Sequence, residues 1–287
     1  MNDQHAFCDT PDLEAVVGSK LYGCSKPGSD EDLRGFVAEP EEYLVGMEGF
    51  EQKEYKDSDR VVYGMKKFFT IVRQGNTNAF EVLFANEYRH MTDIGRLVVE
   101  NRHLFATKAY YRAIRGFALA EWRKARAVTL VMEYDDKEAE DLLTQLAGKY
   151  QLKRFEINEV LDTIFVNREG DPRREVSATR HLGERRKADV QEHGFSVKNA
   201  YHAIRLLHQG IELMETGSLI FPRPNADELR AIRNGEKTIE ELDVRFKELD
   251  AQLQVAAEKS SLPTNADRKA IGDLYLECVR MKLRQTA

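Results

Sequence analysis

The stretch Val16-Val17-Gly18-Ser19-Lys20-Leu21-Tyr22-Gly23, followed by Ser29-Asp30-Glu31-Asp32-Leu33-Arg34-Gly35, decides the fold of the N-terminal part of the chain. An apolar approach ends in Gly-Ser, and a short spacer leads to two aspartates one residue apart. If residues 30–37 form a β-strand, its side chains alternate between faces, so Asp30 and Asp32 point the same way, about 7 Å apart. Two carboxylates on one face can bind divalent cations from one side.

The Gly18-Ser19 turn offers a complementary surface for phosphate. Glycine lets the backbone come close to phosphate oxygens, to which the serine hydroxyl and backbone N–H groups can donate hydrogen bonds. A phosphate cradle beside a metal platform is what metal-assisted nucleotidyl transfer requires. The alternative interpretation is a β-hairpin with a polar turn, in which the acids are solvated and the glycines serve the turn.

Together these residues resemble the signature of the DNA polymerase β-type nucleotidyltransferase superfamily, which is an apolar residue, Gly-Ser, a spacer and Asp-x-Asp. The longer string Gly-Ser-x-x-Tyr-Gly … Ser-Asp-x-Asp-x-Arg-Gly resembles its RlaP-like branch, the RNA-repair-associated proteins of bacteria and phages. The chain also resembles this branch over residues 63–68, 76–84 and 194–206, except that Thr77 stands where the branch usually has a proline. The resemblance covers most of the chain outside roughly 127–180.

This resemblance implies an α+β fold, with an N-terminal mixed β-sheet nucleotidyltransferase core and a C-terminal helical domain. The expected division is a core over 1–90, a helical pair over 91–126, an inserted element with a basic segment over 127–190 and a helical domain over 191–287. We expect a strand near 59–65, a helix over 66–73, an acidic loop over 39–56 that closes over the site, and a strand–helix–strand segment ending near residue 85.

The implied reaction moves an NMP group from an NTP to an acceptor, with an RNA end or tRNA favoured. Mg²⁺ or Mn²⁺ would be held by Asp30 and Asp32. Glu81 is the favoured third carboxylate, because a charge within Ala-Phe-Glu-Val-Leu-Phe is costly to bury without a partner; Asp59 is the rival. Gly18 and Ser19 would seat the β and γ phosphates.

A basic stripe marks the helix predicted from Phe195 to Leu213. Its cations fall at three- to four-residue steps on one face, so they can converge on a phosphate group. The alternative is a solvated basic face paired with acids from another domain. The cations of this helix are Lys198, His202 and Arg205. Together with Lys67 from the N-terminal part of the chain, they are expected to neutralise the charge of the departing pyrophosphate.

Two other functions stay open. One is an AMP-transferase acting on a protein or small molecule, and the other is a catalytically silent RNA-binding or repair-accessory protein. A serine, cysteine or zinc hydrolase is disfavoured, because the sequence has no nucleophile elbow and no ligand-spaced Cys/His set.

Composition restricts the partners. The chain has 287 residues and a net charge of −6, so RNA contact requires a local patch. The candidate patch is Arg173, Arg174, Arg180, Arg185, Arg186 and Lys187, with a solvated face paired to nearby acids as the alternative. Three widely spaced cysteines predict a reducing cytosol, and the lack of a long apolar run predicts no membrane contact. The resemblance implies that this is the cytosol of a bacterium or of a phage-infected host.

Overall fold

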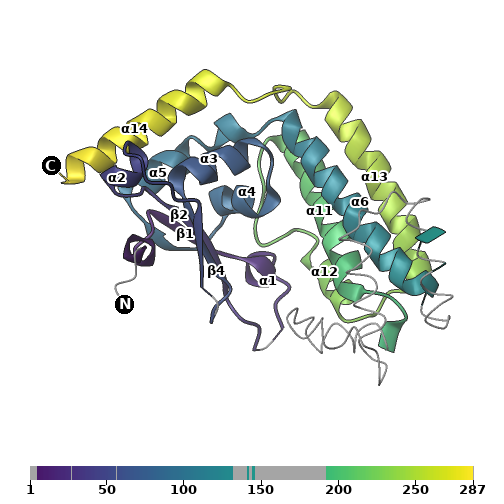
Figure 1. Ribbon diagram of the computed structural model, residues 1–287. Coiled ribbons are helices and arrows are strands. Elements are labelled where there is room, and N and C mark those ends of the chain that lie inside the picture. The colour runs from purple at the N-terminus through teal and green to yellow at the C-terminus, as the bar shows by residue number, and fades with distance from the viewer. Residues whose placement is uncertain are drawn as a thin grey trace. The chain divides into compact units, whose positions relative to one another are not determined.

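The structure, a computed structural model, describes residues 5–26, 28–55, 57–131, 141, 144–145 and 192–286 (Figure 1). The chain divides into two compact units. The first comprises Met1–Ile114, Gln209–Asp227 and Leu253–Ala287, and the second comprises Arg115–His208 and Glu228–Gln252. The division into four consecutive segments stays a prediction.

A mixed five-stranded sheet in the order β3-β4-β2-β1-β5 forms the base of the first unit. β1 pairs antiparallel with β2 and β5, β2 pairs parallel with β4, and β3 pairs antiparallel with β4. The strand expected over 30–37 is found over Asp32–Val37, so Asp30 precedes it, and the strand near 59–65 and the mixed sheet are confirmed. The strands are β1 (Leu13–Val17), β2 (Asp32–Val37), β3 (Gln52–Tyr55), β4 (Arg60–Gly64) and β5 (Tyr88–Met91).

Helices cover one face of this sheet. Phe68 of α3 (Met65–Arg73) stacks on Phe36 of β2 at 4.8 Å between ring centroids, and α4 (Thr77–Phe84) packs on β1 and β2. The run after Gly75 is therefore a helix and not the expected strand. Asn76 begins it, since its side chain accepts a hydrogen bond from the backbone N–H of Ala79 at 3.1 Å.

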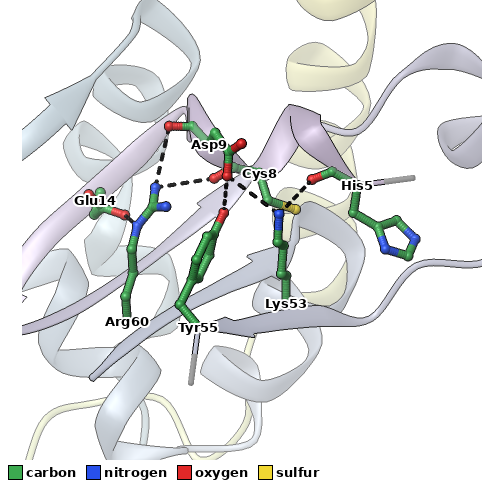
Figure 2. Close-up of polar contacts among 7 residues, drawn as sticks. All are labelled: His5, Cys8, Asp9, Glu14, Lys53, Tyr55 and Arg60. Carbon is green, nitrogen blue, oxygen red and sulfur yellow. Dashed lines mark hydrogen bonds and ion pairs between the residues drawn. The ribbon is translucent and has the colours of Figure 1, made fainter. Parts of the chain in front are cut away.

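Arg60 links the opposite face of the sheet to the short helix η1 (Ala6–Asp9), as Figure 2 shows. Its Nε donates to the carboxylate of Glu14 at 2.6 Å, and its guanidinium also donates to the carbonyls of Cys8 and Asp9 at 3.2 and 3.4 Å. Tyr55 of β3 donates to the Asp9 carboxylate. The segment 39–56, expected as a loop, thus contains an edge strand and the short helix α2 (Glu41–Leu44).

The rest of the described chain is helical, which confirms the α+β class. Within the first unit, α14 packs on α3, α5 and η2, and its Tyr275 meets Phe69 edge to face at 5.4 Å. Within the second, Trp122 stacks on Phe246 at 4.9 Å. No helix in the described ranges is long and apolar enough to cross a membrane. These elements are α5 (Asp93–Glu100), η2 (Arg102–Phe105), α6 (Lys108–Val131), α11 (Val197–Thr216), α12 (Ala226–Arg233), α13 (Ile239–Lys259) and α14 (Arg268–Thr286).

Candidate active site

The Gly-Ser turn and the second aspartate lie in direct contact. β1 and β2 pair so that Val17 is opposite Asp32, and the one-turn helix α1 (Gly18–Leu21) begins at the next residue. Gly18 has φ of +66°, and a Cβ added there would come within 1.9 Å of the Oδ2 atom of Asp32. Only glycine fits this position, because its missing side chain is where the carboxylate lies and because its backbone is left-handed.

The two predicted metal ligands and the acid between them differ in surroundings. Asp30 is exposed and Asp32, the first residue of β2, is partly buried. The side chain of Glu31 forms ion pairs with Lys20 at 3.3 Å and with Arg89 at 2.7 Å. The hydrogen bond from Arg89 lowers the pKa of Glu31 against the opposing effect of burial. The carboxylate of Glu31 therefore binds two side-chain cations of the protein itself.

The parallel pairing of β2 with β4 brings Asp59 beside Asp32. Leu33 is the register partner of Arg60, and its backbone N–H donates to the carbonyl of Asp59 at 2.9 Å. Asp59 directly precedes β4, and the register extended by one residue would put it opposite Asp32 at the same end of the sheet. Among the described residues, however, no group of three or more His, Cys, Asp or Glu side chains is arranged to hold a metal ion.

Arg34, which belongs to the quoted motif but was given no role in the sequence interpretation, is a further candidate for the site. Along β2 it lies two positions after Asp32 and is partly buried. Strand alternation puts it on the same face as Asp32, so a cation and the carboxylates line one surface. The sequence already indicated this position, because Asp30, Asp32 and Arg34 are spaced two residues apart, as side chains on one face of a strand are.

Glu81 lies in the buried interior of the first unit. It is in the middle of α4, its side chain is 1% exposed, and its two carboxyl oxygens accept hydrogen bonds from the hydroxyl of Tyr22 at 2.6 Å and the amide of Gln209 at 2.8 Å. These two partners are a tyrosine and a glutamine, and the expected role of Glu81 in the metal site stays a prediction.

Lys67 lies far from the aspartates. It is in the first turn of α3, which follows the C-terminal end of β4, whereas Asp59 precedes the N-terminal end of the same strand. The strand alone spans about 16 Å. Lys67 pairs with Glu51 at 2.9 Å. Its expected role in neutralising the departing pyrophosphate stays a prediction.

The predicted basic stripe belongs to the second unit. Lys198 is exposed on α11, and Arg205 is buried. Burial lowers the pKa of His202 well below its usual range, and the neighbouring cations Arg205, Lys198, Lys124 and Arg233 lower it further. His202 is therefore neutral near neutral pH and offers a hydrogen bond rather than the positive charge expected of it. The Arg173 to Lys187 patch lies outside the described residues.

Comparison with known proteins gives the reaction class. The RNA repair pathway DNA polymerase beta family (RlaP) matches residues 13–277. The chain belongs to this family. Membership confirms the resemblance carried by the Gly-Ser and Asp-x-Asp motifs and indicates a nucleotidyltransferase.

A relative from a virus supports a phage-type RlaP member. The chain is 24% identical to the uncharacterized 38.9 kDa protein in the nrdC-mobD intergenic region of Enterobacteria phage T4, over 87% of this chain and 90% of that protein. No solved structure matches the chain significantly.

The residues of this RlaP member fit a divalent cation, which members of the superfamily usually use. Asp32, the first residue of β2, and Asp30, two residues before it, offer hard oxygen ligands, and Mg²⁺ commonly binds one or two carboxylates together with substrate phosphates and water. The contact between Asp32 and Gly18 puts one of these ligands directly beside the turn that would receive phosphate. A pair of protein ligands is therefore sufficient when the nucleotide brings the remaining oxygens.

Proposed function

We propose that the chain transfers an NMP group from an NTP to a hydroxyl group of an acceptor, with RNA as the favoured acceptor. The observation that carries the proposal is the contact between the Asp32 carboxylate and Gly18, which joins a metal ligand to a phosphate-binding turn. In this reaction an acceptor oxygen loses its proton and bonds to the α-phosphorus, while the bond from that phosphorus to the pyrophosphate oxygen breaks.

Asp30 and Asp32 would hold Mg²⁺ or Mn²⁺. The bound cation would supply charge stabilisation at the phosphates and favour the ionised acceptor oxygen. The Gly18-Ser19 backbone and the serine hydroxyl would bind the β and γ phosphates, and Arg34 would offer its guanidinium to a phosphate oxygen. Lys198 and Arg205 belong to the second unit, and their expected role of supplying positive charge to phosphate groups stays a prediction.

The third carboxylate of such a site is better assigned to Asp59 than to Glu81. Asp59 is supported by its place directly before β4, where its carbonyl accepts a hydrogen bond from the N–H of Leu33, the residue after Asp32. Glu81 has hydrogen-bond donors on both carboxyl oxygens. This assignment reverses the preference that the sequence suggested.

Labelling tests the proposal. The full-length protein is incubated with each α-labelled nucleoside triphosphate, Mg²⁺ or Mn²⁺, and either RNA or cell extract. We expect label on RNA, with a loss of at least about a hundredfold in Asp30→Asn and Asp32→Asn. Glu31→Gln is the matched control, since this acid is paired with Lys20 and Arg89.

The other outcomes separate the remaining functions. Label on a protein or small molecule would overturn RNA as the acceptor and favour the AMP-transferase. Salt-sensitive RNA binding without any label transfer would overturn the enzyme and favour the accessory protein. Undiminished transfer by Asp32→Asn would contradict its role in metal binding.

A further inference from the structure

The buried carboxyl group of Glu81 connects two parts of the first unit that are far apart in sequence. Its Oε2 atom accepts a hydrogen bond from Tyr22, 59 residues earlier, and its Oε1 atom accepts one from Gln209, 128 residues later. The 2.6 Å distance to the tyrosine oxygen is in the range of a hydroxyl donating to a carboxylate, which is stronger than a neutral hydrogen bond.

Tyr22 is the residue that ends the phosphate-binding turn. It caps α1, and its backbone N–H donates to the carbonyl of Gly18 at 3.1 Å. Its own carbonyl accepts a hydrogen bond from the backbone N–H of Arg223 at 3.2 Å, and its side chain is 5% exposed. A movement of the Tyr22 ring therefore moves the turn that begins at Gly18.

The residue after Tyr22 is also restrained by the 217–226 segment. A Cβ added at Gly23 would come within 2.8 Å of the ring of Pro222. Arg223, 4% exposed, forms an ion pair with Glu212 of α11. The turn is thus held through the Tyr22 hydroxyl on one side and through backbone contacts on the other.

We infer that Glu81 is a positioning residue. It holds the Gly18-Ser19 turn in place by accepting a hydrogen bond from the hydroxyl group of Tyr22. The inference rests on the proposed function for its effect on catalysis, but its structural part stands on the contacts just described. Loss or weakening of this buried hydrogen bond removes a favourable contact from the ordered state and so costs free energy. The turn then samples open conformations more often.

Hydrogen exchange in the free protein tests this directly. Tyr22→Phe removes the donor, and Glu81→Gln removes the negative charge that strengthens the bond, because a neutral amide oxygen is a weaker acceptor than a carboxylate. We expect the amides of residues 18–24 to exchange roughly tenfold faster in both variants. The control is Tyr88→Phe, which removes a hydroxyl that donates to the carbonyl of Val82 in α4 at 3.1 Å without touching the turn.

Three further readouts distinguish positioning from metal binding. We expect the KM for the nucleotide to rise in Tyr22→Phe and Glu81→Gln, with Mn²⁺ affinity unchanged. The double variant should be no worse than the more damaged single variant, because both changes break one interaction. Unchanged exchange at residues 18–24 in both variants would overturn the inference. A loss of Mn²⁺ affinity in Glu81→Gln as large as that in Asp32→Asn would also overturn it.

Failure of the proposed function gives a different pattern. If the wild-type protein transfers no label, the exchange of residues 18–24 still decides whether Glu81 holds the turn. If Glu81→Gln does not fold, Tyr22→Phe alone supplies the exchange comparison.

Discussion

The Oδ2 atom of Asp32 lies where the side chain of any residue other than glycine at position 18 would begin, 1.9 Å from an added Cβ. Gly18→Ala therefore has two costs, the left-handed backbone and the collision with a carboxylate. We expect a loss of stability of about 1–3 kcal/mol and a loss of nucleotidyl transfer. Urea unfolding and label transfer measure the two effects.

Gly28→Ala is the matched control for this prediction. Gly28 also has a positive φ, +76°, but nothing lies within 4 Å of an added Cβ. Its variant carries the backbone strain without the collision, so it should lose some stability and retain transfer. Equal transfer by Gly18→Ala and Gly28→Ala would contradict the importance of the Asp32 contact.

Glu39 gives a prediction about pH. Burial raises the pKa of its carboxyl group, repulsion by Asp12 adds to this, and hydrogen bonds from its own backbone and the Met65 N–H, with attraction by Lys282, oppose it. The folded state then disfavours the ionised form, so stability is full below the ordinary glutamate pKa and is lost as the pH rises through the folded pKa.

Glu39→Gln should thus stabilise the protein at pH about 7.5, and the gain should disappear at pH about 4, where both states bind the proton. Glutamine can still accept the hydrogen bond that Glu39 takes from Met65 at 3.1 Å. Urea unfolding at both pH values measures the difference, with exposed Glu51→Gln as the control. Destabilisation at neutral pH would contradict the prediction.

The ion pair of Arg60 with Glu14 (Figure 2) should be far more important for stability than the ion pair of Lys67 with Glu51. The side chain of Glu14 is 4% exposed, whereas that of Glu51 is 78% exposed. Arg60→Met leaves a buried carboxylate uncompensated and should cost about 3–5 kcal/mol. Lys67→Met should cost less than about 1 kcal/mol, as exposed pairs do. Similar unfolding midpoints for the two variants would refute this difference.

Two lysines predicted from the sequence should differ in function. Lys198 is exposed on the basic face of α11, whereas Lys67 lies at the end of β4 away from the aspartates. Lys198→Gln should raise the KM for an anionic substrate several-fold and reduce the salt dependence of binding by about one phosphate contact. Lys67→Gln should change neither quantity. The opposite ranking would place the substrate phosphates near α3.

The central strands and the aspartate pair could be predicted because their signals are local. Val16-Val17 and Phe36-Val37 read as buried strands, and the Gly-Ser and Asp-x-Asp motifs lie within twenty residues. The edge strands β3 and β5 could not be predicted this way. Gln52–Tyr55 and Tyr88–Met91 are short and largely polar, because an edge strand faces solvent on much of its surface.

Helix α4 shows the limit of periodicity. Every residue from Ala79 to Phe84 is buried, so the segment has no polar face, and a short apolar run reads equally as strand or helix. The partners of Glu81 show a second limit. Contacts across 59 and 128 residues depend on the tertiary fold, which no local pattern encodes.

Binding of Mn²⁺ in the presence of a non-hydrolysable nucleoside triphosphate, followed by electron paramagnetic resonance, tests most directly whether the paired aspartates hold a cation beside the Gly18-Ser19 turn. We expect at least about a tenfold loss of Mn²⁺ affinity in Asp32→Asn. We expect no loss in Glu31→Gln, whose carboxylate is paired with Lys20 and Arg89. Equal Mn²⁺ affinity in the wild type and Asp32→Asn would contradict this role of the aspartates.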